Sequence, residues 1–475
     1  MKNYNRFALT EAQLHGVISE GMRRGGEWCD LYFEDTEYGD LLLRDGEVTS
    51  GGHHIDCGCG IRVLSGEKTG YAYSEGLDYE SLLKAASAAG SIATVGGSVS
   101  RREAFAAQAL APGFTAPDRY PMRSDWRGSD TAALEDFLRR LDSEIRRRDS
   151  RVIKVIASLS WSVSEVMMFN SLGELTSDRR PLGSVSVQTI FRQGEQTENS
   201  SVSRSLRAGV EMIGPEVLED LASRAVAGID ERFEARRPKG GQMSVVMGAG
   251  ASGILLHEAM GHAFEADFNR KGQSIFSDRM GQRICRKGIN IIDDGTITAN
   301  RGACSYDDEG IPGQKTYMVT DGVLTSYLHD RISAAYYGVS PTGNGRRESF
   351  RYNPIPRMRA TYMESGGDGT VGDLIASVQK GIYVDQFANG QVKIGEGDFT
   401  FYVRSGFLIE GGRLTMPVKD INIIGNGPQA LADIEAVAGD LKIDESTWTC
   451  GKEQSVAVSC GIPSVLISNL TVGGE

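Results

Sequence analysis

The chain lacks two features that would each indicate a particular class of protein. No stretch approaches the roughly 18 consecutive apolar residues of a membrane span, so no membrane segment is expected. No tract of lysine or arginine runs beyond a few residues and the net charge is −12, which argues against nucleic acid as a direct partner. The 475 residues are 40% hydrophobic and 24% charged, which is typical of a globular protein with two or three domains.

A secretion signal and a disulfide pattern are also missing from the sequence. The stretch from Met1 to Phe7 contains no apolar core of the kind found in a signal peptide. The seven cysteines are an odd and scattered set, and a protein of this size does not need disulfides for its stability. We therefore expect reduced cysteines and a cytoplasmic location.

Histidine is scarce, yet two of the six histidines flank a glutamate in His257-Glu258-Ala259-Met260-Gly261-His262. Two histidines and a glutamate on one helix are the usual components of a catalytic zinc site, with the glutamate as general base. The two histidines here are five residues apart, which on a regular α-helix separates them by about 140° and keeps them off one face. A π-bulge would bring them together, and Gly261 would make that deformation less costly.

A third protein ligand is needed, because catalytic zinc usually has three with water in the fourth position. The candidates are Glu265, Asp267, His329 and Cys450. The two acidic residues are weaker candidates because they follow His262 closely on the same segment. Cys450 precedes a glycine that permits close approach, but a buried free cysteine explains it equally well. Without a metal, the two histidines are unrelated helix residues and Glu258 lies on an exposed helix face.

A glycine-rich turn before the histidines supports an alternative function. Residues 248–253 match the GxGxxG of dinucleotide-binding proteins and follow an apolar strand, Met243 to Met247, which favours a nucleotide-dependent oxidoreductase. Against this, the helix carries the histidines, and the following segments do not alternate as in a doubly wound domain. A third hypothesis is a metal-stabilised scaffold that binds a partner chain, although a structural zinc site would have four protein ligands.

Helices and strands alternate in short blocks along the first half. Periodicity and capping predict helices at 10–22, 79–93, 130–148 (capped by Ser129) and 215–227. Alternating apolar residues predict antiparallel strands at 31–33, 41–43, 61–64, 152–163 and 184–191. We divide this half into an N-terminal subdomain, 1–108, and a middle subdomain, 109–236.

The rest of the chain, 237–475, is rich in strand and turn signals such as Asp294-Gly295 and Asp321-Gly322. We expect it to form a large, mostly antiparallel β domain that carries the metal-binding helix. The predicted fold class is therefore α+β, with helices and antiparallel strands in the N-terminal region.

The histidine stretch and several later motifs resemble the TldD/PmbA family of metallopeptidases. The similarity continues directly after His262 through 265–272, and it extends to 307–310, 327–331, 341–349, 450–452 and 470–474. A weaker similarity covers 60–63 and 68–71. The resemblance therefore accounts for essentially the whole chain.

The resemblance implies that His257, His262 and Cys450 bind zinc and that Glu258 is the catalytic base. It implies a metallopeptidase acting on small or unfolded peptides, which enter the interior cavity of a dimer. One branch of the family keeps the HExxxH motif and the other has lost it, and the two can pair. This chain keeps every element and so resembles the active TldD type, as a homodimer or as a heterodimer with a PmbA/TldE-like paralogue. Four further residues in these motifs could contact substrate or hold loops together, and none is assigned a role: His329, Arg331, Asn344 and Arg346.

Overall fold

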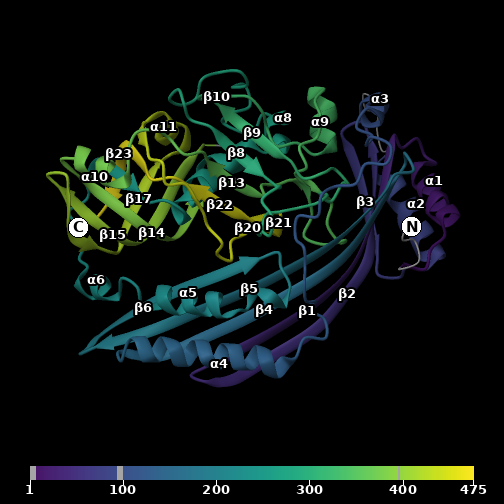
Figure 1. Cartoon of the computed structure of the whole chain (residues 1–475). Coiled ribbons are helices and arrows are strands. Elements are labelled where there is room, and N and C mark those ends of the chain that lie inside the picture. The colour runs from purple at the N-terminus through teal and green to yellow at the C-terminus, as the bar shows by residue number, and fades with distance from the viewer. Residues whose placement is uncertain (1–6, 94–99, 394–395, 475) are drawn as a thin grey trace.

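The structure is a computed structural model that describes residues 7–93, 100–393 and 396–474. Long strands from the first half make one curved sheet, and the second half forms a β-rich body above it (Figure 1). The stretch tested for a signal peptide falls mainly in residues 1–6, which lie outside the described residues. No helix within the described ranges combines the length and the apolar character needed to cross a bilayer.

The first sheet has six antiparallel strands in the order β3-β2-β1-β4-β5-β6. The strands are β1 (Trp28–Arg44), β2 (Glu47–Ser65), β3 (Lys68–Ser74), β4 (Val152–Asn170), β5 (Leu175–Gln193) and β6 (Gln196–Leu206). The prediction of separate strands at 31–33 and 41–43 is wrong, because both segments belong to β1. The polar residues between them stay in the strand because β1 pairs with β2 on one side and with β4 on the other. The sheet thus includes strands from both of the first two predicted subdomains, and their boundary remains a prediction.

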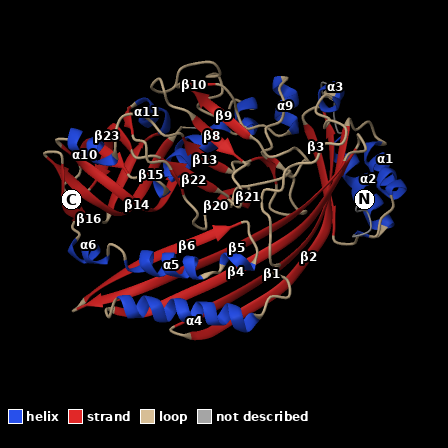
Figure 2. Ribbon diagram, viewed as in Figure 1, coloured by secondary structure: helices blue, strands red, loops and turns tan. Residues whose placement is uncertain are grey.

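Helices cover one face of this sheet, two at each end (Figure 2). Successive side chains of a strand point to opposite faces, and alternate residues of β1 and β4, such as Leu31, Phe33 and Leu159, are apolar and pack on these helices. The N-cap of α4 is Asp130, which accepts a hydrogen bond from the Ala132 N–H, so the predicted cap at Ser129 is one residue early. The helices are α1 (Glu11–Met22), α2 (Tyr79–Ala93), α4 (Thr131–Arg148) and α5 (Pro215–Val226), with short pieces at α3 (Arg102–Ala106), η2 (Val210–Met212) and α6 (Ile229–Glu234).

The opposite face of the sheet is polar and contacts the second half of the chain. Ser158 on β4 and Ser186 on β5 share a hydrogen bond of 2.7 Å on this face. Tyr32 of β1 lies in one buried cluster with Tyr306 and Phe350, which belong to the second half. The space between the sheet and the second half is therefore lined by hydroxyl and charged groups on the sheet side.

The second half contains a sheet that closes on itself. Its strands follow the order β14-β7-β23-β17-β15, and β15 pairs again with β14. Pairing is antiparallel except between β7 and β14. The strands are β7 (Gly241–Met247), β14 (Lys380–Val392), β15 (Asp398–Glu410), β17 (Ile421–Asn426) and β23 (Val465–Gly473), and the sheet is extended by β16 (Arg413–Val418) and β18 (Ile434–Val437).

A second six-stranded sheet, in the order β10-β9-β8-β13-β22-β19, shares its hydrophobic core with the closed sheet. Its strands are β8 (Ile291–Asp294), β9 (Lys315–Thr320), β10 (Val323–Leu324), β13 (Ala360–Met363), β19 (Lys442–Ile443) and β22 (Ser459–Ile462). Two strand pairs, β11 (Gly345–Arg346) with β12 (Ile355–Pro356) and β20 (Thr449–Lys452) with β21 (Gln454–Ala457), lie outside it. This half also contains the helices α9 (Arg331–Tyr337), α10 (Val371–Ser377) and α11 (Gly427–Ala432).

One irregular helical segment packs between the closed sheet and the second sheet. It runs through η3 (Ala251–Gly253), α7 (Ile254–Leu256), η4 (His257–Gly261) and η5 (His262–Phe264), and α8 (Ala266–Arg270) follows it. The segment is buried on most sides: Leu255, Leu256 and Phe264 are all fully inaccessible to solvent. Helices, antiparallel sheets and this enclosed helix together confirm the predicted α+β class.

Candidate metal centre

The two histidines of the HExxxH stretch lie at the two ends of a π-helical turn. The backbone N–H of His262 donates to the carbonyl of His257, which is an i→i+5 hydrogen bond. The two imidazole rings consequently lie next to each other in an edge-to-face arrangement, with centroids 5.2 Å apart and planes at 81°. The π-bulge predicted from the five-residue spacing is confirmed.

Gly261 contributes to this turn through its small size. Its backbone has φ −57° and ψ −47°, ordinary helical values that any residue adopts, so conformational freedom is not what is required here. A Cβ at this position would lie 2.0 Å from the Met358 sulfur, and 3.3 Å from the Leu256 carbonyl oxygen. The glycine therefore lets the Met358 side chain pack directly against the helix beside the two histidines.

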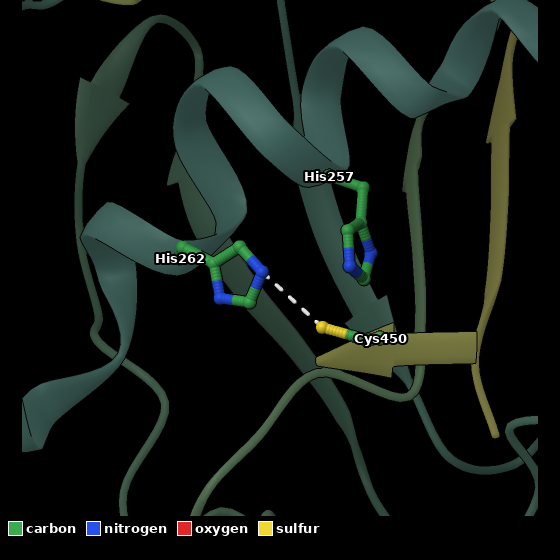
Figure 3. Close-up of side chains that lie close together, drawn as sticks. All are labelled: His257, His262 and Cys450. Atoms are coloured by element: carbon green, nitrogen blue, oxygen red, sulfur yellow. Dashed lines mark hydrogen bonds between the residues drawn. The ribbon is translucent and has the colours of Figure 1, made fainter. Parts of the chain in front are cut away.

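Cys450 joins the two histidines from a distant part of the sequence. It lies on β20, and its Sγ is 3.2 Å from His262 Nε2 (Figure 3). One donor atom from each of His257, His262 and Cys450 lies within 4.8 Å of the others, and all three residues are buried. The imidazole of His257 also points toward the sulfur, as the close-up shows. Of the four candidates for a third ligand, only Cys450 belongs to this group among the described residues.

Two features of the group fit a zinc ion: the chemical types of its ligand atoms, and the buried nitrogens of His257 that have no hydrogen-bond partner among the described residues. Both ring nitrogens of His257 are buried and have no hydrogen-bond partner within the described part of the chain. A buried polar group without a partner is costly, and a metal bond would satisfy one of these nitrogens. Two imidazoles and one thiolate are ligands that zinc accepts, and three protein ligands leave a fourth position open.

The charges around the group favour a deprotonated sulfur. Burial alone would raise the pKa of Cys450, but the adjacent His257 and His262 lower it to about 4. Burial likewise opposes charge on His262, yet Glu265 and the Cys450 sulfur raise the pKa of His262 to about 10. The protein therefore stabilises the thiolate, which is the form that binds metal.

Charged side chains lie on the side of the His262 ring that faces away from Cys450. Glu265, which is fully buried, lies 2.9 Å from His262 Nδ1 and accepts a hydrogen bond of 3.0 Å from Lys452 Nζ. Lys452 also donates to Asp267 at 2.8 Å. Burial would raise the pKa of Glu265, but Lys452 and His262 lower it to about 2. A carboxylate at Nδ1 fixes the ring so that Nε2 faces the metal position.

Arg357 fixes the backbone that carries Cys450, a role that was not predicted from the sequence. Its guanidinium donates to the carbonyl oxygens of Cys450 at 2.8 Å, Gln454 at 2.7 Å and Lys452 at 3.3 Å. The residue is completely buried. No local motif marks Arg357. The i,i+3 spacing of His262 and Glu265, by contrast, was a usable sequence signal for a supporting carboxylate.

The other predicted residues occupy different places. Glu258 is half-buried, and its charge contributes to raising the pKa of the Cys460 thiol on β22, after burial and Asp444. His329 lies apart from the metal group, with Nδ1 3.3 Å from the Ser333 hydroxyl, and burial lowers its pKa to about 4. His329 is therefore a neutral core histidine in this structure.

A cavity of about 1000 Å³ separates the polar face of the first sheet from the second half of the chain. Ser158, Ser186 and Arg404 line it, and so does Trp448, which packs against Cys450. The cavity therefore reaches residues next to β20, the strand that carries Cys450.

The glycine-rich turn at 248–253 has a packing role. A Cβ on Gly253 would lie 2.5 Å from the Gly461 backbone nitrogen, so this glycine allows the helix to pack tightly on β22. The preceding strand, β7, pairs in parallel with β14 but antiparallel with β23, which is unlike the parallel sheet of a doubly wound domain. The structural setting of a dinucleotide site is absent around these residues.

Comparison with known proteins gives one consistent family. Models described as PmbA/TldA metallopeptidase domain 1, central domain and C-terminal domain match residues 29–93, 125–229 and 240–474. The chain is 38% identical to a metalloprotease TldD homolog of Haemophilus influenzae, over 98% of this chain and 97% of that one. It is 32% identical to a zinc metalloprotease TldD homolog of Saccharolobus solfataricus, over 61% of this chain and 65% of that protein.

Solved structures show the same fold at low sequence identity. A Thermotoga maritima protein described as a modulator of a DNA gyrase has a TM-score of 0.77 and 20% identity, covering 98% of this chain and all of that one. TldE from Thermococcus kodakarensis has a TM-score of 0.72 and 17% identity, covering 97% of this chain and 100% of its own. At these identities the likeness concerns the fold alone.

Proposed function

Because the chain belongs to the PmbA/TldD family of metallopeptidases, we propose that it is a zinc-dependent peptidase that hydrolyses small or unfolded peptides. The observation that carries this proposal is the buried group of His257, His262 and Cys450. The unpartnered nitrogens of His257 and the low pKa of Cys450 suit a cation that prefers nitrogen and sulfur ligands. The name of the Saccharolobus relative supports zinc as that cation.

The residues around the group have distinct roles in the proposed reaction. Bound zinc would supply Lewis-acid polarisation of the scissile carbonyl and of the attacking water. Glu258 follows His257 directly, and its carboxylate takes a proton from the attacking water and passes one to the leaving amine nitrogen. Glu265 holds the His262 ring through Nδ1, and Arg357 holds the Cys450 backbone. Both residues position ligands and do not touch substrate.

The cavity of about 1000 Å³ is the proposed entrance for peptides. It combines serine hydroxyls on the sheet side with apolar side chains such as Phe387 and Trp448. A mixed surface of this kind accepts an extended backbone without demanding one side-chain sequence. Folded proteins are too large for it, which is why the proposed substrates are small or unfolded peptides.

The proposed assembly is a dimer, with a second copy or with a TldE-like paralogue. The fold shared with TldE, over nearly the full length of both chains, supports a pairing of two similar subunits. The proposed location is the cytoplasm.

Metal content measured together with peptide hydrolysis tests this function. We expect one zinc per chain by mass spectrometry in the wild type, and hydrolysis of an unstructured fluorogenic peptide. His257→Ala, His262→Ala and Cys450→Ala should each lose zinc, and hydrolysis should fall to background with it, because each removes one of three ligands.

Matched controls use the same residue types outside the group. His329→Ala and Cys285→Ala remove another buried histidine and another buried cysteine, and both should keep zinc. Zinc retained in Cys450→Ala but lost in His329→Ala would contradict the ligand set. A metal-free wild type that hydrolyses no peptide would overturn the proposed function.

A further inference from the structure

A second, smaller cavity of about 160 Å³ lies between the polar face of the first sheet and loops of the second half. Its distinguishing feature is a set of arginines, contributed by both halves of the chain, that line its walls: Arg180, Arg207, Arg346, Arg347 and Arg359. We call this space the arginine cavity. Arg346 and Arg359 are only 5% and 4% exposed, so they are deeply buried charges.

Two of these arginines have carboxylate partners. Arg180 donates to Asp178 at 2.9 Å and also bonds Asp308. Arg347 lies 3.7 Å from Asp30 and stacks over the Tyr32 ring at 4.2 Å. Their charges are therefore compensated within the protein.

The other three have no carboxylate within ion-pair distance anywhere in the described residues. Arg207 donates from Nε to the Arg301 carbonyl at 3.2 Å. Arg346 donates to the carbonyls of Met358 and, at 2.7 Å, Ala457. Arg359 donates to the Gly343 carbonyl at 2.6 Å. Carbonyl dipoles satisfy some N–H groups of these side chains, but they do not neutralise three positive charges.

Nearby acidic groups reduce the excess of positive charge without removing it: Asp293, Asp307 and Asp308 interact with Arg359 from beyond ion-pair distance. Asp308 already accepts hydrogen bonds from the Arg180 guanidinium and from the Arg347 backbone N–H. Burial raises the pKa of Glu34 to about 7, so this carboxyl is only partly ionised at neutral pH. Glu348 is exposed at the edge and accepts a 2.6 Å hydrogen bond from the Ser455 N–H. Burial and the neighbouring arginines Arg359 and Arg207 lower the pKa of Arg346 well below its usual value.

The arginine cavity adjoins the strand pair that carries Cys450. Val456 lines the cavity, and in the β20–β21 ladder it pairs directly with Cys450. Val456 and Cys450 also share one buried cluster. A ligand in the arginine cavity and an ion at the metal group would thus both contact residues of the β20–β21 hairpin.

We propose that the arginine cavity is a binding subsite for a carboxylate of the peptide substrate, supplied by its C-terminus or by an acidic side chain. Arg207, Arg346 and Arg359 provide the charge, and guanidinium groups bind carboxylates through paired, charge-assisted hydrogen bonds. This inference rests on the proposed peptidase function and extends it by naming a substrate class, peptides that carry a carboxylate near the cleaved bond.

The test compares three peptides that differ only in their carboxylates. One has a free C-terminus and neutral side chains, the second is amidated and carries one glutamate, and the third is amidated and neutral. In Arg207→Met, kcat/KM should fall about tenfold for one or both of the carboxylate peptides and stay within about twofold for the neutral one. The peptide affected identifies whether the carboxylate comes from the terminus or from a side chain.

Two further variants separate charge from folding. Arg204→Met removes an arginine three residues earlier, which is paired with Glu445 at 2.9 Å outside the arginine cavity, and should leave all three peptides within about twofold. Arg207→Lys keeps the charge and should retain part of the preference. An equal loss for all three peptides in Arg207→Met, or no loss for any, overturns the subsite.

Binding in the absence of turnover distinguishes this inference from the proposed function. Calorimetry on Glu258→Gln, and on the same protein with Arg207→Met added, measures affinity for the three peptides without hydrolysis. A carboxylate preference of about tenfold that disappears with Arg207→Met supports the subsite even if the wild type hydrolyses nothing. Equal affinity for all three peptides contradicts it even if the wild type is an active peptidase.

Discussion

The metal group and the arginine cavity lie beside the same β20–β21 hairpin and have opposite charge imbalances. Around the metal group, four anionic groups, the Cys450 thiolate and the carboxylates of Glu258, Glu265 and Asp267, outnumber three cationic ones, Lys452, Arg357 and the protonated His262. Around the cavity, Arg207, Arg346 and Arg359 lack carboxylate partners within the described residues. Buried charge is costly unless it is paired, so each region is complete only with a ligand of the opposite sign.

The two regions also differ in how firmly neighbouring groups hold the side chains that would contact a ligand. At the metal group, Glu265 orients His262 and Arg357 holds the Cys450 backbone, so the donors are fixed in advance. At the cavity, two backbone carbonyls hold the Arg346 side chain, while one carbonyl each holds Arg359 and the half-buried Arg207. A rigid cation site suits catalysis at one position, whereas a looser anion site suits a variable substrate group.

The largest expected effect separates catalysis from metal binding. Glu258→Gln should lower kcat for peptide hydrolysis by about 10² to 10⁴-fold, because the amide cannot take the proton from the attacking water. Zinc per chain should stay at the wild-type value, since Glu258 is outside the ligand group. Steady-state kinetics and mass spectrometry on one sample check both. Unchanged turnover would favour a metal-stabilised scaffold over an enzyme.

A smaller effect tests whether Glu265 holds the His262 ring in the orientation that binds metal. Glu265→Gln should weaken zinc binding by about 10- to 100-fold, because the neutral amide no longer fixes and polarises the His262 ring. Competition with a chelator measures the affinity. The matched control is Glu364→Gln, which removes a carboxylate 3.2 Å from Lys315 and away from the group. Equal zinc affinity in both variants would show that Glu265 does not support the ligand.

The smallest effect concerns the arginine cavity and depends on pH. The pKa of Glu34 is about 7 in the folded protein, against 4.5 for an ordinary glutamate, because the side chain is buried. The folded state therefore keeps a proton that the unfolded state loses, so the free energy of unfolding falls as pH rises from 4.5 through 7. Glu34→Gln should remove this fall and gain about 2 kcal/mol over the wild type between pH 5.5 and pH 8.

Urea unfolding at a series of pH values measures this gain. The control Glu47→Gln replaces an exposed glutamate at the start of β2 and should shift stability equally at all pH values. A Glu34→Gln variant whose stability follows the wild-type pH dependence would show that Glu34 is not buried as a neutral acid.

Local sequence patterns predicted the parts of the structure that local interactions determine. The α2 helix matches its predicted range, 79–93, and the π-turn follows from the spacing of His257 and His262. The length of β1 was underestimated because its middle residues are polar, and they remain in the strand only because two neighbouring strands pair with it. Long-range pairing of this kind leaves no signal in the hydrophobic pattern.

In the candidate site, too, local sequence patterns predicted some residues, and long-range contacts determined the others. The residue patterns placed two donors on one helix but left the third open among four candidates. Only the fold brings Cys450 to His262 across 188 residues. Arg357 and the unpaired arginines were not predictable, because a buried charge is recognised by its neighbours in space and the sequence does not give them.

X-ray absorption at the zinc edge of the zinc-loaded protein tests the central claim most directly, because it counts the ligand atoms by type. We predict one sulfur at about 2.3 Å and two imidazole nitrogens at about 2.0 Å, with the remaining position filled by a lighter atom from water. A zinc shell without sulfur, or with two or more sulfurs, would contradict ligation by His257, His262 and Cys450.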